Sequence, residues 1–124
     1  MNLIDIAEVG VAGGIGAVAR FAVDSAVRRR TGGALPVGTI VINLTGSFIL
    51  GLLTGLVLYH GAPARLVLVA GTGFCGGYTT FSTASFETVR LVQTGHMRSA
   101  SINLFGTLVG AVLAGAAGLA VATF

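Results

Sequence analysis

The chain has 124 residues and a net charge of +3, and 54% of its residues are hydrophobic while only 9% are charged. Soluble domains carry about 25% charged residues. The composition therefore excludes a soluble globular protein and predicts a single membrane domain over residues 1–124, a multi-pass protein of the plasma membrane surrounded by lipid. All seven basic residues are arginines. They are not interleaved with aromatic residues, which argues against a nucleic-acid partner.

The first apolar segment covers residues 3–27 and predicts a transmembrane helix. No basic residue precedes Arg20, so the positive region of a signal peptide is missing and we expect the helix to be retained. Gly10 and Gly14 predict a face that packs closely on another helix. Arg20 either faces a polar interior or extends to the headgroups, and its spacing from Asp24 allows an ion pair.

The second predicted helix covers residues 37–59 and is uncharged, but it carries a polar line. Thr39, Asn43 and Ser47 recur every four residues and therefore share one face of the helix. An asparagine here either forms a simple interhelical hydrogen bond or lines a polar path. Three polar residues in register favour the path. A close-packing face is predicted from two small residues, Gly51 and Gly55.

An uncharged run over residues 66–86 is long enough to cross a membrane, but glycines and hydroxyl residues fill its centre. Glycine disfavours helix by about 1 kcal/mol relative to alanine, so the pair Gly76-Gly77 predicts a break near mid-membrane. In lipid, each backbone group freed by a break costs several kcal/mol unless protein, water or an ion satisfies it. The break therefore indicates an ion site near the bilayer midplane.

The last predicted helix covers residues 99–124 and is uncharged. Its small residues recur every four positions and predict a packing face, while two polar residues are also four apart. The four segments together predict an all-α integral membrane fold with four transmembrane helices, the third of them broken. The small residues are Gly106, Gly110, Ala114 and Gly118, and the polar ones are Asn103 and Thr107.

Three motifs follow one another along the chain. They are Gly13-Gly14-x-Gly16-Ala17-x-x-Arg20, Gly38-Thr39-x-x-x-Asn43-x-x-Gly46-Ser47-Phe48 and Gly73-Phe74-Cys75-Gly76-Gly77-Tyr78-Thr79-Thr80-Phe81-Ser82-Thr83. With these motifs the sequence resembles the Fluc/CrcB fluoride channels over nearly its whole length. The resemblance implies an antiparallel, dual-topology dimer with two pores that pass fluoride out of the cell passively, and one central structural sodium ion (Na+) that is not transported.

The resemblance also implies roles for particular residues. The pore asparagine corresponds to Asn43, the first pore phenylalanine to Phe81, and the sodium-coordinating carbonyls to Gly76 and Thr79. Fluoride is small and strongly hydrated, so donors must replace its water shell, and the positive edge of an aromatic ring suits an anion. The further candidates for the fluoride pathway are Thr39, Ser82, Thr83, Thr107 and Arg20.

The chain departs from the family pattern in two respects. Ala84 stands where the family has its second pore phenylalanine, and Phe86 lies on another side of the helix. The arginines are also biased, because all but Arg20 and Arg65 are expected at one membrane face. The positive-inside rule then favours a cytoplasmic arginine loop at 28–30 and an external N-terminus. The second subunit is therefore either a copy of this chain or an oppositely oriented family member.

Other functions explain the sequence less well. The spacing Gly71-x-Gly73-x-x-Gly76 matches a dinucleotide-binding fingerprint, but no acidic residue follows Glu87 to bind a ribose. No catalytic constellation is present, so we do not expect an enzyme. A small four-helix multidrug exporter would use an acid such as Glu8, but tryptophan is absent. A membrane scaffold would leave the polar residues without a purpose.

Overall fold

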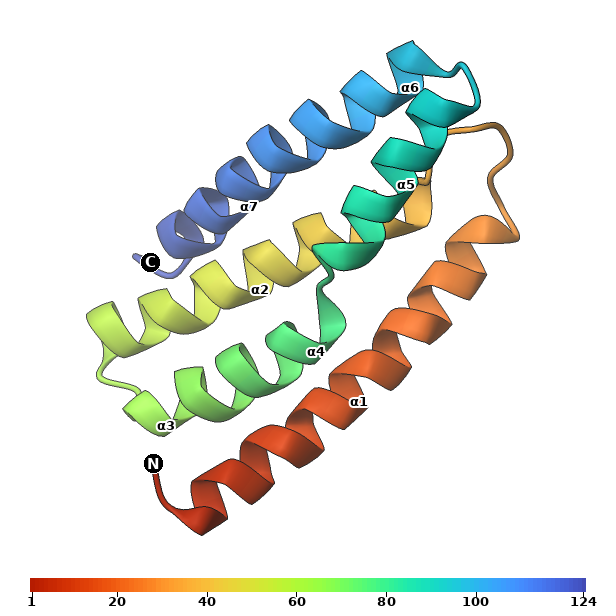
Figure 1. Ribbon diagram of the computed structural model, residues 1–124. Coiled ribbons are helices and arrows are strands. Elements are labelled where there is room, and N and C mark those ends of the chain that lie inside the picture. The colour runs from red at the N-terminus through yellow and green to blue at the C-terminus, as the bar shows by residue number, and fades with distance from the viewer.

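A computed structural model describes all residues 1–124 and shows antiparallel helical segments in four passes (Figure 1). The first two passes are α1 (Leu3–Arg28) and α2 (Val37–His60). The third consists of α3 (Ala64–Leu66), the π-helical η1 (Val67–Cys75), α4 (Gly76–Tyr78) and, after a break, α5 (Ser82–Gln93). The fourth consists of α6 (Met97–Ser101), the π-helical η2 (Ile102–Gly106) and α7 (Thr107–Val121).

Three helices are long and apolar enough to cross a membrane: α1, α2 and the continuous helix Met97–Val121. The third pass consists of two shorter pieces, because the chain leaves helical geometry in its middle. The all-helical membrane fold is thus confirmed. The count of four transmembrane helices and the antiparallel dimer stay predictions.

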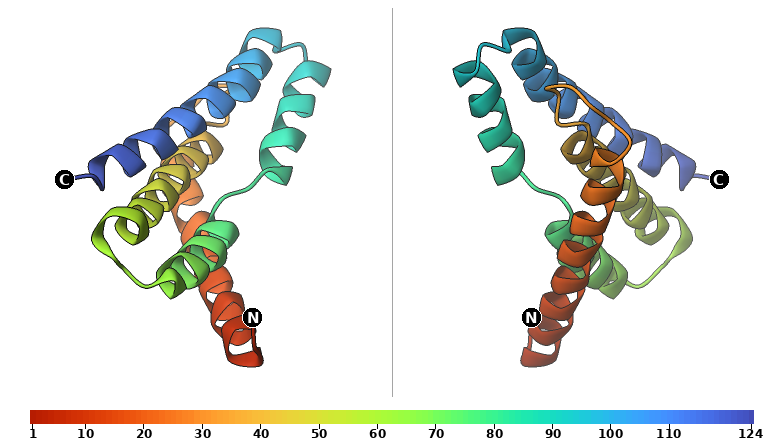
Figure 2. Two further views of the ribbon diagram at one scale, coloured as in Figure 1. Left: turned by 90° about the vertical axis from the view of Figure 1, so that its left-hand side faces the viewer. Right: turned by 90° about the vertical axis from the view of Figure 1, so that its right-hand side faces the viewer.

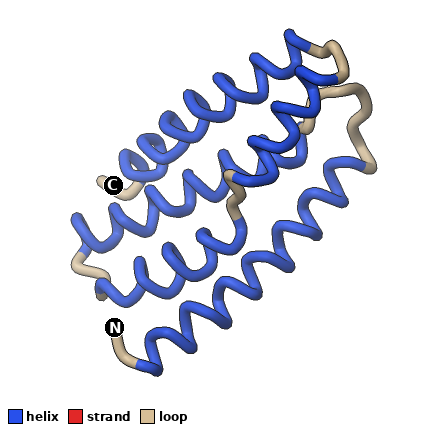
Figure 3. Tube along the Cα trace, in the orientation of Figure 1, coloured by secondary structure: helices blue, strands red, loops and turns tan.

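A break in the third pass was expected near Gly76-Gly77, and that position is wrong by about one helical turn. Gly76 has helical dihedrals, with φ −62° and ψ −39°, whereas Thr79 is extended, with ψ 161°. Figure 2 shows α5 leaving the line of α4 at this point, and Figure 3 shows the loop in the middle of the bundle. Gly77 serves close packing instead, because a Cβ atom there would overlap the backbone of Gly13 on α1.

The packing face of α1 differs from the expected one. A Cβ atom on Gly10 or on Gly14 would meet no other atom within 4 Å, so these two glycines do not form the predicted contact. The glycines that contact the third pass are Gly13 and Gly16, on the adjacent side of the helix. A Cβ atom on Gly16 would overlap the carbonyl oxygen of Phe74. The spacing of the glycines did not reveal which side of α1 faces its neighbour.

Helix α2 packs along α7 through the glycines that the sequence predicted. Gly51 lies against the backbone of Gly115, and Gly55 lies against Ala122. On the other side of the same contact, Gly118 lies against the backbone of α2. Side chains at these positions would separate the two helices, so the close approach depends on the missing Cβ atoms.

The expected packing face of the fourth pass is only partly present. Gly110 contacts Leu44 of α2, in agreement with the prediction. Gly106 does not, because its only neighbour is Ile102 of its own helical pass. The face that contacts α2 therefore begins one helical turn later than the repeat of small residues suggested.

The charged residues gather at the two ends of the bundle. The α1–α2 loop and the α5–α6 turn lie at one end, whereas both termini and the α2–α3 turn lie at the other (Figure 1). The arginines of residues 28–30, Arg90 and Arg98 therefore lie at the same end, and Arg65 lies at the opposite end. This distribution agrees with the arginine bias inferred from the sequence.

We expect Gly16→Ala to lower the free energy of unfolding by about 1–3 kcal/mol, because the added methyl group forces α1 away from the third pass. Gly10→Ala is the matched control on the same helix, since its Cβ meets open space. Thermal unfolding in detergent measures both. Equal effects of the two variants would contradict the packing described for α1.

Candidate functional site

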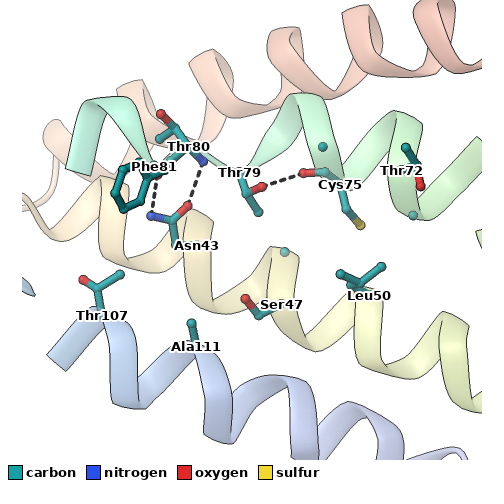
Figure 4. A pocket seen from close by; sticks show the side chains of 13 residues that line it. Asn43, Ser47, Leu50, Thr72, Cys75, Thr79, Thr80, Phe81, Thr107 and Ala111 are labelled. Carbon is teal, nitrogen blue, oxygen red and sulfur yellow. Dashed lines mark hydrogen bonds between the residues drawn. The ribbon is translucent and has the colours of Figure 1, made fainter. Parts of the chain in front are cut away.

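The break in the third pass is held by one side chain of α2. The Asn43 amide donates from Nδ2 to the carbonyl oxygen of Thr80 at 2.9 Å, and its Oδ1 accepts the Thr80 backbone N–H at 2.9 Å (Figure 4). Both residues are 8% exposed. Asn43 thus supplies a buried donor and a buried acceptor where the helix supplies neither. We call this pair of bonds the Asn43–Thr80 clasp.

The clasp changes the partners of two further carbonyl groups. In a continuous helix, the Thr80 N–H would bond the carbonyl of Gly76, and the Thr83 N–H would bond that of Thr79. Here the Thr80 N–H bonds Asn43, and the Thr83 N–H bonds the Thr80 hydroxyl at 3.1 Å. The carbonyls of Gly76 and Thr79 therefore lose their helical hydrogen bonds, and those of Gly77 and Tyr78 accept no backbone hydrogen bond either. Gly76 and Thr79 are the two residues whose carbonyls the family resemblance assigned to a cation.

An open hollow of about 490 Å³ lies beside the break, between α2, the third pass and α7 (Figure 4). Asn43, Phe81 and Thr107, three of the residues expected on the fluoride pathway, line it together with Ser47 and the two cation candidates. The Thr107 hydroxyl is buried and has no hydrogen-bond partner. Phe81 is 87% exposed. No charged side chain lines this first hollow.

A second hollow of about 370 Å³ lies on the other side of the clasp, toward the arginine-rich end. It is lined by Arg20, Thr39 and Thr83, three further candidates from the sequence, and Thr80 lines both hollows. The predicted pathway residues therefore form two groups with the clasp between them. Ser82 lines neither hollow, and its hydroxyl lies 3.4 Å from that of Thr80.

Arg20 and Asp24 do not form the ion pair that their spacing allows. Asp24 pairs instead with Arg28, whose Nε lies 2.8 Å from Oδ2 of Asp24. Arg28 also reaches Glu87 on α5 at 3.2 Å, and Glu87 accepts a hydrogen bond from the Thr39 hydroxyl at 2.6 Å. Arg28 is favoured because it contacts two carboxylates at once. The sequence showed the spacing of Asp24 and Arg28 but not the approach of α5.

Asn103 is a structural residue whose partners the sequence did not reveal. Its side chain is 1% exposed, and Nδ2 donates to the Thr88 hydroxyl at 2.8 Å and to the Ala84 carbonyl at 3.3 Å. These bonds join the fourth pass to α5, which packs little against the rest of the bundle. A polar residue in an apolar helix was the available signal, but its spacing from Thr107 did not indicate that its partners lie on α5.

At the opposite end, Arg65 joins the third pass to the start of α1. It donates to Asp5 at 2.6 Å and also to Glu8. These hydrogen bonds, to Asp5 first and then to Glu8, raise the pKa of the Arg65 guanidinium. Glu8 is therefore engaged in an ion pair at the rim of the bundle, which does not fit the proton-coupled acid of a drug exporter.

Side chains do not provide a metal site, because no cluster of three or more His, Cys, Asp or Glu residues is present. Cys75 is buried and free. A cation at the break would therefore bind backbone oxygens. The carbonyls of Gly76 and Thr79 are suitable in chemistry, since hard cations prefer oxygen ligands.

Comparison with known proteins gives a consistent group of relatives. The family model described as "CrcB-like protein, Camphor Resistance (CrcB)" matches residues 7–119. "Fluoride-specific ion channel FluC 1" of Leifsonia xyli subsp. xyli is 50% identical over 119 residues, which are 96% of this chain and 85% of that protein. "Fluoride-specific ion channel FluC 2" of Cutibacterium acnes is 48% identical, and the match covers 90% of this chain and 92% of that protein. "Fluoride-specific ion channel FluC" of Methanocaldococcus jannaschii is 43% identical, and the match covers 85% of this chain and 83% of that protein.

We expect Asn43→Ala to lower the free energy of unfolding by about 1–3 kcal/mol, because it leaves the buried N–H and carbonyl of Thr80 without partners. Ser47→Ala is the matched control, since Ser47 lies on the same face of α2 but forms no hydrogen bond through its side chain. Unfolding in detergent, followed by circular dichroism, measures both. An Asn43→Ala protein as stable as the control would show that the clasp does not hold the break.

Proposed function

Because this chain belongs to the CrcB family, we propose that it is a fluoride-specific ion channel, through which fluoride leaves the cell passively. The relatives are named as ion channels, so the chain is a multi-pass membrane protein and not an enzyme. The observation that best supports fluoride passage is the first hollow. There the unpartnered Thr107 hydroxyl, the Asn43 amide and the exposed Phe81 ring border an uncharged space.

These groups match what a small anion needs. Nδ2 of Asn43 carries two hydrogens, and the clasp uses one of them, so one donor is left for an ion. The Thr107 hydroxyl supplies a second donor, and the edge of the Phe81 ring supplies a weakly positive surface. Because the hollow has no fixed positive charge, binding stays weak enough for release, as conduction requires.

The second hollow extends this path toward the arginine-rich end. Its hydroxyl groups, from Thr39, Thr80 and Thr83, lie near Arg20, which forms no ion pair. A guanidinium without a direct carboxylate partner keeps its N–H donors available to an anion at this mouth. Fluoride would pass from the second hollow to the first beside the Asn43–Thr80 clasp, so the clasp marks the narrow part of the path.

A structural sodium ion at the break is the second part of the proposal. The carbonyls of Gly76 and Thr79 lack helical partners, and Gly76 is exposed with no atom within 4 Å of its Cβ position. Two carbonyls are too few for a cation. A second subunit, related by a two-fold axis, would supply two more and complete a site of four oxygens at the dimer interface.

The dimer itself is proposed as antiparallel. The exposed ring of Phe81 and the exposed Gly76 both suit a surface that a second subunit covers. Ala84 in place of a pore phenylalanine, together with the arginine bias, favours an oppositely oriented family member as that subunit. The near-complete set of motifs favours a copy of this chain. The chain expressed alone separates the two possibilities.

We expect the chain, purified alone and reconstituted in liposomes, to release fluoride, as followed by a fluoride electrode. Asn43→Asp should reduce the rate by roughly tenfold or more, because like charges 4 Å apart repel by ~4 kcal/mol at an effective dielectric constant near 20. Thr54→Ala, nearer the C-terminal end of the same helix, is the control.

Two results would separate the parts of this proposal. Efflux that requires co-expression of a second family member would assign a heterodimer. No efflux in either preparation, or normal efflux from Asn43→Asp, would refute the channel or its path.

We expect sodium to hold the dimer together. Gly76→Val should disrupt the dimer while leaving the subunit fold intact, because a Cβ atom at this position meets no neighbouring atom of its own subunit within 4 Å. Gly10→Val, equally open within the subunit, is the control. Size-exclusion chromatography measures the dimer and a fluoride electrode measures efflux, each in a sodium salt and in the salt of a large organic cation. A sodium-free protein that stays dimeric and conducts normally would rule out the site.

A further inference from the structure

Four charged side chains surround the second hollow or adjoin it. Arg20 and Asp24 line it, and Arg28 connects Asp24 at 2.8 Å to Glu87 at 3.2 Å. Glu87 does not line the hollow itself, but it accepts a hydrogen bond from Thr39, which does. Helices α1, α2 and α5 thus meet at a chain of charges beside the path proposed for fluoride.

The two members of the Arg28–Glu87 pair differ in exposure. The Glu87 side chain is 15% exposed, whereas that of Arg28 is 55% exposed. The carboxylate is therefore mostly removed from water, and the guanidinium that neutralises it faces the solvent. Without Arg28, water would screen the charge of Glu87 only weakly.

Asp24 adds a second carboxylate to this end of the path. Its Oδ2 binds Arg28, while its Oδ1 is buried without a partner beside Gly38. Two carboxylates at the mouth of an anion path oppose entry of the anion. Their charge of −2 is balanced by Arg20 and Arg28 together, and loss of either arginine leaves the mouth negative.

We propose that Arg28 sets the rate of anion entry at this mouth by neutralising Glu87, and that Asp24 is the positioning residue that holds Arg28 in place. The inference rests on the proposed function and adds a residue that no motif includes. It also separates Arg28 from Arg29 and Arg30, which form no ion pair. Those two neighbours carry the same charge outside the network.

Fluoride efflux from liposomes tests the role of Arg28. We expect Arg28→Gln to slow efflux by roughly tenfold, from the repulsion of an unneutralised carboxylate. Arg28→Lys, which keeps the positive charge, should slow efflux much less. Arg30→Gln is the matched control for a general loss of positive charge. Raising the ionic strength with an impermeant salt, from about 0.01 M to 1 M, shortens the screening length from ~30 Å to ~3 Å and should partly restore Arg28→Gln.

The double variant Arg28→Gln/Glu87→Gln separates an electrostatic role from a purely structural one. The double variant lacks the Glu87 carboxylate that repels the anion. Its efflux rate should therefore be within about twofold of the rate of Glu87→Gln alone. A double variant as slow as Arg28→Gln, or one that fails to assemble on size-exclusion chromatography, would overturn the proposal, because the network would then be only a clamp. Normal efflux from Arg28→Gln would also overturn it. A wild-type protein that passes no fluoride would refute the channel function instead.

Discussion

The two hydrogen bonds between Asn43 and Thr80 make the rest of this structure possible. A helix interrupted inside a membrane exposes backbone groups that lipid cannot satisfy. Here one amide on the neighbouring helix satisfies both the N–H and the carbonyl of the same residue. This pairing offsets part of the cost of the interruption, which has two effects. It turns α5 away from α4, and it leaves the carbonyls of Gly76 and Thr79 available to a ligand.

The clasp requires that two backbones come close together, and small residues allow this. Gly46 lies one turn from Asn43, and a Cβ atom there would overlap the side chain of Thr79. Gly13 and Gly16 let α1 support the third pass from the other side. The glycines thus do not create the break. They set the distance between helices at which the Asn43 side chain reaches the backbone of Thr80.

Periodicity and hydropathy were sufficient to predict an all-helical membrane fold of four helical segments, the interruption of the third segment and the polar face on α2. They failed where the answer depends on a neighbouring helix. Gly76-Gly77 has the weakest helix propensity, but the break lies where Asn43 supplies hydrogen bonds. Gly10 and Gly14 have the spacing of glycines that pack on another helix, but α1 contacts the third pass through Gly13 and Gly16 instead. Asp24 is four residues from both Arg20 and Arg28, and it pairs with Arg28 because Arg28 also contacts Glu87 on α5. Each failure reflects tertiary contacts that local sequence does not encode.

The clasp also places unequal demands on the two residues that form it. Asn43 contributes its side chain, and neither aspartate, which lacks the donor, nor glutamine, which is longer by one methylene group, has the same shape and chemistry. Thr80 contributes its backbone, which every residue except proline possesses. Its hydroxyl accepts the Thr83 N–H at the start of α5 and lies 3.4 Å from the Ser82 hydroxyl, and the capping role is one that serine, aspartate or asparagine also fills. The clasp itself therefore admits almost no other side chain at position 43, whereas at position 80 it requires only a backbone N–H and carbonyl.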